Sequence, residues 1–449
     1  MAEPNASSDS EIGARPGRGW AAVALSALFH CLVLGSYFCL RPVREAMGVQ
    51  GAFWNLYWLF GCTLVVMVLA SVVYAWATTR VSRRVFIPAS YGFFMLNLLG
   101  FAALLWWAPD AVDVRIGWAF FVWLSVFNMF VLSVFWSFMS DGWLLEESKR
   151  AYPIVAVGGT VGALGGAALS GALVGSIGPV GLMLVAIGLL GGALGCFLAL
   201  DIGWFRTARD PDPETPKVVD AEWPIKGRAL SGLTRLARSR YLLGIAGYIG
   251  LMTIANTFLY FTRSELIADT SDELEARVQL FAYIDTLQQG LTLVAQLLVT
   301  GALLRRLGVG VVLGIAPVVV ALGFTALAIW ETYAVVAVFS ALYGMSRHAF
   351  ARPARETLFT VVSREDKYRA KNMIDTVVYR GGDVVGMGAQ AAIALALGVA
   401  GLALAAAPMA VVWVGLGVWL ARSQAARRTI GGSDDGTATD GPQPAAASG

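Results

Sequence analysis

The sequence predicts an all-α membrane protein of about twelve transmembrane helices, arranged as two pseudo-symmetric halves of six helices each. Of the 449 residues, 57% are hydrophobic and only 14% are charged, whereas a soluble domain carries about 25% charged residues. The apolar residues form runs of roughly 20 residues, the length of helix that crosses a hydrocarbon core of about 30 Å. An internal repeat divides these runs into two sets.

Twelve apolar runs, separated by short polar breaks, are the predicted membrane spans. The first is followed by Arg41 and Pro42 and not by a small-residue cleavage site, so we expect it to be retained as a helix. In order, the spans are 19–40, 53–77, 85–107, 116–139, 153–176, 178–200, 240–262, 278–303, 309–329, 332–350, 372–398 and 400–420.

The basic residues of the short connections indicate the orientation, because Lys and Arg resist translocation across the membrane. One side carries Arg80, Arg83, Arg84, Lys149, Arg150, Arg305, Arg306 and the dense basic group from 347 to 371. The other side carries the acidic stretch 265–275. We therefore expect the basic side and both termini to be cytoplasmic, and the protein to lie in a bacterial inner (plasma) membrane.

The one long hydrophilic connection follows the sixth span and divides the chain. The expected organisation is a cytoplasmic tail (1–18), a first half (19–200), a cytoplasmic linker with a surface amphipathic helix (201–239), a second half (240–420) and a disordered cytoplasmic tail (421–449).

Catalytic and metal-binding motifs are absent from the sequence. It has only two histidines, His30 and His348, and it has no phosphate-binding lysine motif, no paired-histidine spacing and no nucleophile elbow. We expect no enzymatic activity, no cofactor and no metal. The four cysteines all fall within predicted spans and are expected to be free thiols. The net charge of +3 is explained by the cytoplasmic loops, so lipid and not nucleic acid is the expected partner.

The two halves repeat each other at an offset of about 222 residues. Three widely spaced landmarks share this offset, which favours duplication of a six-helix unit over chance. The pairs are Arg41 with Arg263, 83–84 with 305–306, and 158–159 with 381–382.

A shorter repeat of about 90 residues lies inside the second half, where Ile-Asp-Thr occurs at 284–286 and again at 374–376. Three spans separate the start of one copy from the start of the other, so the copies have opposite membrane orientation. This inverted repeat is the arrangement nested in each half of a major facilitator transporter.

Span eleven offers the clearest candidate for a substrate site. Counted from Asn372, Arg380 lies roughly 12 Å and Asp383 roughly 16 Å into the membrane, where ionisable groups are costly. With Tyr379 they could line a central binding site. The alternative is a purely structural ion pair at helical i, i+3 spacing.

Span eight contributes a second polar set, Asp285, Gln288 and Gln289, which could bind polar groups of a substrate or a coupling cation. Interhelical hydrogen bonding is the structural alternative. Arginines at membrane depth could hold an anionic substrate, because a guanidinium stays charged and presents paired donors. Arg41, Arg263 and Arg380 are the leading candidates.

Two Arg-Pro-x-Arg-Glu elements, at 41–45 and 352–356, are predicted to lie on opposite sides of the membrane and to form gates. Proline should kink or end each helix there, and anchoring at the membrane interface is the competing interpretation. Asp375, the counterpart of Asp285 in the repeat, is grouped with the gates. The expected outer gate pairs Arg41, Arg44 and Glu45 with Arg263, Glu265 or Asp285. The expected inner gate pairs Arg352, Arg355 and Glu356 with Asp141, Glu146 or Glu147.

These segments resemble the nucleotide exchange (ATP:ADP antiporter) family, a divergent branch related to the major facilitator fold. The resemblance spans most of residues 30–395. The segments that carry it are 40–48, 83–88 with Tyr91, 135–138, 149–150, 352–356, 367–371, 375–376 and 379–383.

The resemblance implies exchange of a nucleotide or related phosphorylated solute across the inner membrane, driven by a counter-substrate or an ion gradient. The chain departs from the family in one respect. The nucleotide carriers are expected to use intramembrane lysines, whereas all five lysines here lie in or beside predicted cytoplasmic segments. This departure disfavours adenine nucleotides and leaves other anions open.

We therefore predict a secondary transporter for a polar, anionic solute, functional as a monomer, with any coupling ion left open. The alternative is a receptor or assembly factor that keeps the transporter fold without turnover. Gate charges on both sides favour the transporter, since a protein that does not cycle needs only one closed set.

Overall fold

The computed structural model describes residues 19–51, 54–107, 114–143, 145–205, 236, 239–362, 371 and 373–434, and nearly all of them are helical. The α-helices are α1 (Trp20–Gly48), α2 (Asn55–Arg80), α3 (Arg83–Trp107), α4 (Val114–Gly142), α5 (Leu145–Leu200), α7 (Arg240–Thr270), α8 (Leu274–Val294), α9 (Thr300–Ile329), α10 (Tyr333–Met345), α11 (Arg352–Leu358) and α13 (Tyr379–Asp434). Short π-helical segments, η1 (Asp201–Phe205), η4 (Ala295–Val299), η5 (Ser346–Ala351) and η7 (Ile374–Val378), and the 3₁₀ turn η6 (Phe359–Val361) continue them.

Within the described residues, nine helical stretches are long and apolar enough to cross a membrane. Three of them are divided by a glycine with positive φ, at Gly178 (62°), Gly308 (72°) and Gly398 (61°). Positive φ interrupts the helix at each of these positions, and the chain turns back there. Only glycine adopts this left-handed conformation without strain. The stretches thus contain twelve helical arms, which confirms the predicted fold class.

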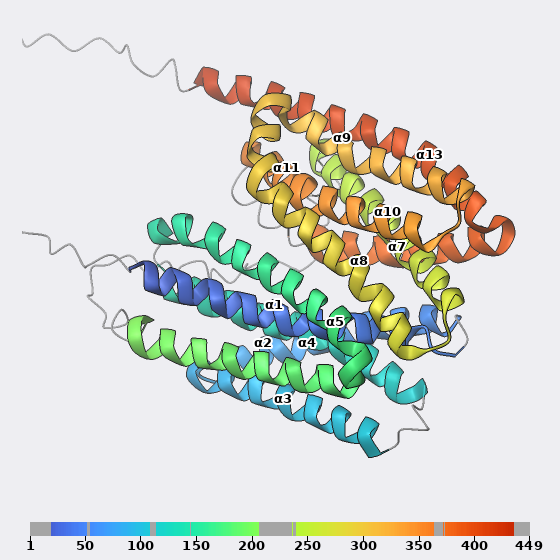
Figure 1. Cartoon of the computed structure of the whole chain (residues 1–449). Helices are drawn as coiled ribbons and strands as arrows, with labels where there is room; N and C mark the ends of the chain where they lie inside the picture. Colours follow the sequence, from blue (N-terminus) through green and yellow to red (C-terminus); the bar gives the residue numbers. More distant parts are fainter. Residues whose placement is uncertain are drawn as a thin grey trace, which may run out of the picture.

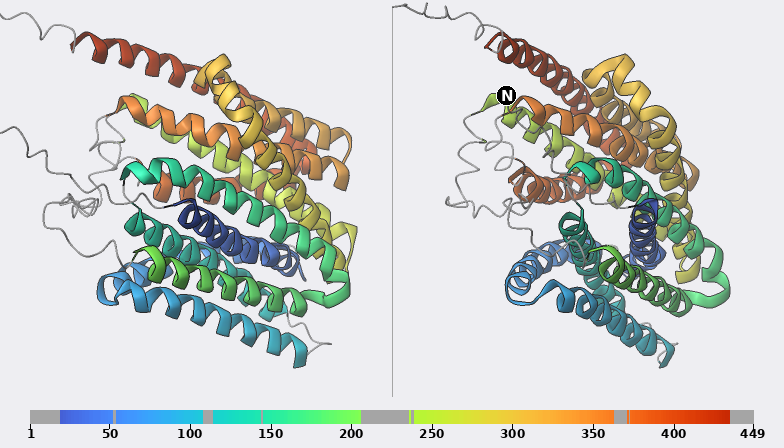
Figure 2. Two further views of the ribbon diagram at one scale, coloured as in Figure 1. Left: turned by 60° about the vertical axis from the view of Figure 1, so that its left-hand side comes forward. Right: turned by 90° about the vertical axis from the view of Figure 1, so that its left-hand side faces the viewer.

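The helices form two bundles, α1 to α5 in one and α7 to α13 in the other (Figure 1). A second view from a different side keeps the same division (Figure 2). Each bundle has its own cluster of buried apolar side chains, and the first cluster also takes in the part of α7 and α8 around Phe261 and Phe281. Large apolar residues such as Leu298, Leu395 and Val411 are exposed on the outside, as expected of surfaces that face lipid. The chain is a multi-pass membrane protein.

Among the described residues, the main contacts between the bundles are those of α5 with α8, α1 with α8 and α2 with α13. The first arm of α5 runs beside α8 and its continuation η4. The Thr160 hydroxyl lies 3.2 Å from Gln296 Oε1 of η4, and the Gln279 amide of α8 donates to the Gly171 carbonyl at 3.4 Å. On the other side, α2 meets α13. In Figure 1 the bundles lie closest where α1 ends and α8 begins, and they spread apart toward the end where α1 begins and α13 ends. We name these the closed end and the spread end.

Glycines let α1 and α5 approach until their backbones touch. A Cβ on Gly158, Gly162 or Gly166 of α5 would meet the carbonyl oxygen of a residue of α1, respectively Ala27, Cys31 and Gly35. Small residues at a spacing of four give such close packing in membrane helices. This pair forms the rigid centre of the first bundle.

Three predicted helix boundaries differ from the structure. The first helix does not end at Arg41 but continues through Pro42 to Gly48, because its side chains on both sides of the proline, such as Leu40 and Ala46, are fully buried. Residues 201–205 extend the helical arm beyond the expected end of the first half.

The last helix also runs further than expected, to Asp434. It is held beyond residue 420 by Gln424, whose amide donates to the Thr357 carbonyl at 2.6 Å, and by Arg427, which stacks on the Tyr241 ring. The predicted tails at 1–18 and 435–449, and the predicted linker helix except Leu236 and 239, lie outside the described residues.

Candidate functional site

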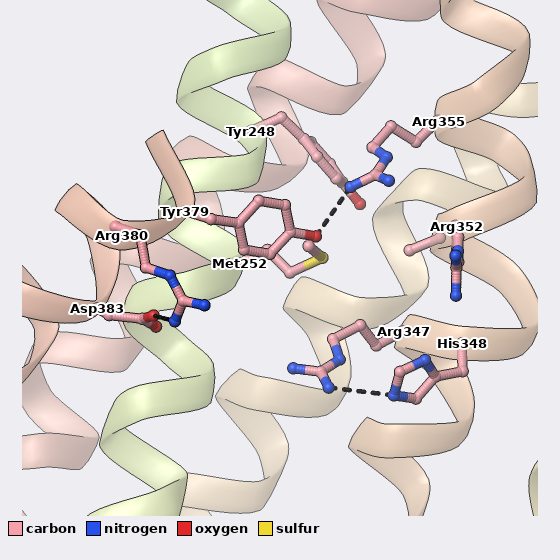
Figure 3. Close-up of a pocket in the computed structure, with 10 residues that line it drawn as sticks. Tyr248, Met252, Arg347, His348, Arg352, Arg355, Tyr379, Arg380 and Asp383 are labelled. Atoms are coloured by element: carbon pink, nitrogen blue, oxygen red, sulfur yellow. Dashed lines mark hydrogen bonds and ion pairs between the residues drawn. The ribbon is translucent and has the colours of Figure 1, made fainter. Parts of the chain in front are cut away.

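A cavity of about 400 Å³ lies within the second bundle, between α7, the continuous α10–η5–α11 helix and α13 (Figure 3). It is lined by Tyr248, Met252, Arg347, His348, Ala351, Arg352, Arg355, Tyr379, Arg380 and Asp383. We call this cavity the arginine pocket. All ten of these described lining residues belong to the second bundle.

Helical spacing places one wall of the pocket. Residues 347, 348, 351, 352 and 355 recur at four- and five-residue steps, so they share one face of the helix. The π-helical segment η5 carries the first three of them, and such wider turns are frequent at functional sites. A second π-helical segment, η7, lies directly before Tyr379 and Arg380.

The three arginines of this wall differ in the number of hydrogen bonds that their guanidinium groups make within the protein. Arg347 donates to the Asn256 amide oxygen and lies 3.0 Å from Nε2 of His348. Arg355 is buried and donates to the Tyr379 hydroxyl at 2.8 Å. Arg352 is exposed and makes no hydrogen bond or ion pair with any other residue that the structure describes.

The opposite wall is α13. Arg380 Nη1 lies 3.4 Å from Asp383 Oδ2, and its Nη2 lies 3.6 Å from Met67 Sδ of the first bundle. Thr257 Oγ1 lies 3.5 Å from Asp383 Oδ1. Gly382 holds this part of α13 close to α7, because a Cβ there would press on Thr253.

The arginine pocket is strongly cationic, since its lining residues include four guanidinium groups and one carboxylate. Placing such groups in a membrane-spanning helix costs a few kcal/mol each by insertion scales, so they mark functional cavities. Guanidinium groups form paired, charge-assisted hydrogen bonds with phosphate and carboxylate. The pocket is suited to a small organic anion.

A second buried charge cluster joins the two bundles at the closed end. Arg41 Nη1 lies 3.0 Å from Asp285 Oδ1 across the interface, and Arg44 Nη1 lies 3.0 Å from Glu45 Oε1. The Tyr260 hydroxyl donates to Glu45 Oε2 at 2.7 Å, also across the interface. Both carboxylates are only 2% exposed. We call these five residues the closed-end cluster.

Other groups extend the contact between the bundles around this cluster. Arg263 is 6% exposed and lies against the rings of Tyr260 and Phe281, with 5.7 and 5.5 Å from the guanidinium carbon to the ring centroids. The Tyr57 ring of α2 stacks on Phe261 at 4.3 Å, and its hydroxyl donates to the Gln390 side chain of α13 at 2.5 Å.

The structure thus separates the substrate-site residues predicted from the sequence into two groups. Tyr379, Arg380 and Asp383 line the arginine pocket, whereas Arg41 and Asp285 belong to the closed-end cluster. The other three, Arg263, Gln288 and Gln289, are buried and are not among the residues that line the pocket. Gln288 packs against Gly344, where a Cβ would overlap its side chain.

Of the predicted outer-gate pairings, Arg41 contacts Asp285 at 3.0 Å, and Arg263 is an electrostatic neighbour of Glu45. Arg44 pairs with its neighbour Glu45 and lies over the Phe121 ring of the same bundle at 3.9 Å. Glu265 has Asp269, Glu331 and, from α2, Tyr57 as its electrostatic neighbours.

The predicted inner gate pairs differently in this structure. Glu356 binds Lys371 Nζ at 2.7 Å and Arg355 Nη2 at 3.5 Å, both within the second bundle. Arg352 and Arg355 line the pocket, since the helix continues past Arg352 through η5 and does not end there. Asp141 and Glu147 are partly buried on α4 and α5, while the side chains of Glu146 and Asp375 lie outside the described part.

Five described pocket residues were not among the predicted candidates: Ala351, Tyr248, Met252, Arg347 and His348. The signal for the last two was present in the sequence, because 347, 348, 352 and 355 share one helical face. Tyr248 and Met252 come from α7 and carry no such signal.

A scan against protein-family models finds no match, and a search of curated proteins finds no significant match. Several solved structures share the fold at low sequence identity. A point mutant of the nucleoside transporter NupG matches with a TM-score of 0.54 and 13% identity, covering 91% of this chain and 99% of that one.

Two further structures match similarly. A bacterial homolog of the human lysosomal transporter Spinster, solved inward-facing and unoccupied, has a TM-score of 0.54 and 15% identity and covers 91% and 98%. A POT family transporter in complex with 5-aminolevulinic acid has a TM-score of 0.62 and 8% identity and covers 90% and 96%. At these identities the likeness establishes the fold alone, an all-α membrane fold that this chain shares with these transporters.

Proposed function

We propose that this protein is a secondary transporter that moves a small organic anion across the membrane by alternating access. The observation that carries the proposal is the arginine pocket, four guanidinium groups and one carboxylate enclosed by membrane-spanning helices. Its volume of about 400 Å³ falls within the range of about 300–1,000 Å³ typical of small-molecule sites.

Phosphorylated solutes are the anions we favour. Two of the segments that resemble the nucleotide exchange family, 352–356 and 379–383, supply five of the residues that line the pocket. Guanidinium groups bind phosphate in a bidentate fashion and remain charged at any physiological pH. The proposed solute is therefore nucleotide-like or otherwise phosphorylated, and an exchange mode would need no separate energy source.

The distribution of Lys and Arg assigns the spread end to the cytoplasm, since that end carries the basic connections. Together with the contacts at the closed end, this favours an inward-open state of a bacterial inner-membrane protein with both termini cytoplasmic. In the outward-open state the closed-end cluster would separate and the bundles would meet at the spread end. The solute would then be released on the opposite side.

Counterflow in liposomes tests the proposal. Purified protein is reconstituted in vesicles preloaded with unlabelled nucleotides, phosphorylated metabolites or dicarboxylates, and the entry of the labelled solute is followed with and without a proton gradient. We expect saturable counterflow for at least one anion. Stimulation by the proton gradient would identify the proton as a coupling ion, and a strict dependence of uptake on the internal solute would identify exchange.

Saturable binding without any counterflow, from protein shown to be folded in the vesicles, would contradict transport. It would favour the alternative of a receptor that keeps the transporter fold. Protein-free vesicles and vesicles with an unrelated transporter are the controls for leakage.

Loss of the ion pair between the bundles is expected to open the closed end. In Asp285→Asn, Arg41 loses its 3.0 Å partner, and a buried pair that loses one charge is destabilised by about 3–5 kcal/mol. We expect the outward-open population to rise, measured as a longer distance between spin labels at Trp54 and Glu273 in a background without native cysteines. Both label positions are exposed, one on each bundle.

The matched control is Asp272→Asn, which removes an exposed carboxylate near the same end. It should leave the label distance unchanged, because Asp272 is fully exposed and its partner Arg277 keeps its hydrogen bonds to the Ser271, Val49 and Ala268 carbonyls. Unchanged distances in Asp285→Asn as well would show that the Arg41–Asp285 pair does not hold the closed end together.

A further inference from the structure

Among the described residues that line the arginine pocket, Asp383 is the one carboxylate. A site built only to hold an anion gains nothing from it, because a carboxylate repels a bound anion and lowers its affinity. The side chain is 14% exposed and lies on α13, across the pocket from Arg347 and Arg352 (Figure 3). Its presence therefore needs an explanation other than anion binding.

The contacts of Asp383 within the protein are weak. Arg380 Nη1 lies 3.4 Å from Oδ2, longer than the about 2.7–2.9 Å of a charge-assisted hydrogen bond. Arg380 is 41% exposed, and its other terminal nitrogen is turned toward Met67 of the first bundle. The pair is not a closed, fully bonded ion pair.

Oxygen Oδ1 of Asp383 is even less satisfied. The described hydrogen-bond contact of Oδ1 is with the Thr257 hydroxyl at 3.5 Å, but that hydroxyl also lies 3.0 Å from the Thr253 carbonyl oxygen. A hydroxyl has one proton to donate, and the shorter contact takes it. Among the described residues, Oδ1 of this pocket-lining carboxylate thus has no short hydrogen bond.

From this geometry we infer that the pocket recognises a solute with two kinds of polar group, an anionic group and a hydrogen-bond donor, which we call two-pole recognition. This inference rests on the proposed function. The anionic group binds the guanidinium groups of Arg347, Arg352 and Arg355, and an ammonium or hydroxyl group of the same molecule donates to Asp383. The substrate class is an organic anion that also carries a proton-donating group. A plain phosphate or carboxylate would occupy only one wall.

Matched pairs of probes test this inference by titration calorimetry on the purified full-length protein. The pairs are O-phosphoethanolamine with ethyl phosphate, glycerol phosphate with propyl phosphate, and 4-aminobutanoate with butanoate. We expect the donor-bearing member of at least one pair to bind about tenfold or more tightly, the effect of one hydrogen bond to a charged group. The pair that responds distinguishes an ammonium group from a hydroxyl.

Asp383→Asn should move the two members of that pair in opposite directions. The donor-free anion should bind several-fold more tightly, because a repelling charge is gone, and the donor-bearing one should bind about tenfold more weakly. A role of Asp383 in holding the structure alone would weaken both members equally. Glu331→Gln removes an exposed carboxylate between α9 and α10 and should change neither affinity.

The failure of the inference differs from the failure of the proposed function. Equal affinities within every pair, or equal shifts in Asp383→Asn, would overturn two-pole recognition and leave the anion site in place. If none of the six probes binds to folded protein, the anion site itself is overturned and the inference falls with it.

Discussion

Arg380→Ala is expected to abolish solute uptake while the protein remains inserted and folded. The variant loses a guanidinium group that lines the pocket and leaves Asp383 without its 3.4 Å partner. Each lost charge-assisted hydrogen bond weakens binding by about 1.5–3 kcal/mol, and the freed carboxylate adds repulsion. We expect counterflow to fall at least about 100-fold, with the fold verified by an unchanged thermal midpoint in detergent.

A matched control lies on the same helix. Arg422→Ala removes an exposed arginine of α13 that does not line the pocket, so uptake should stay near the wild-type rate. Uptake by Arg380→Ala equal to that of Arg422→Ala would remove Arg380 from the solute site.

Gly162→Ala is expected to destabilise the first bundle strongly, although it adds only one methyl group. That methyl group would overlap the Cys31 carbonyl group of α1, and a backbone cannot rotate away as a side chain can. Overpacking typically costs about 1–3 kcal/mol and occasionally more, and we expect the upper end of this range. The measurement is the thermal or denaturant midpoint of the purified protein in detergent.

Gly165→Ala, three residues along α5, is the comparison. Nothing lies within 4 Å of a Cβ built there, and the residue is exposed. The free energy of unfolding of this variant should rise by about 1 kcal/mol or less, since alanine has a higher helix propensity than glycine. Equal midpoints for the two variants would contradict the close backbone contact between α1 and α5.

The number of membrane spans follows from the sequence because each apolar run has the length of one bilayer. The three turns at Gly178, Gly308 and Gly398 are short, yet the flanking runs are too long for a single helix, so the division was predictable. Helix ends were less predictable. Burial of Leu40 and Ala46 carried α1 past Pro42, and such packing depends on neighbours that the sequence pattern does not identify.

The candidate site was predicted only in part. Tyr379, Arg380 and Asp383 were found because charges inside an apolar run must face a cavity or a partner. The same argument selected Arg41 and Asp285, which the structure places in the closed-end cluster. Helical spacing gives the face of a helix on which a residue lies, but not which helix that face meets, so the two groups could not be separated beforehand.

The confinement of the charged pocket to one bundle also bears on the membrane potential. The described lining residues have a formal charge of +3 with His348 neutral, from four arginines and one aspartate. Moving one elementary charge across the whole potential is worth about 2.3 kcal/mol per 100 mV. If the second bundle carries its charges through part of that field, the return of the empty protein is the voltage-sensitive step, and a bound dianion reduces the sensitivity by neutralising two of the three charges. The return step would then move charge across the membrane. A change in the clamped membrane potential would alter the rate of transport without any change in solute affinity.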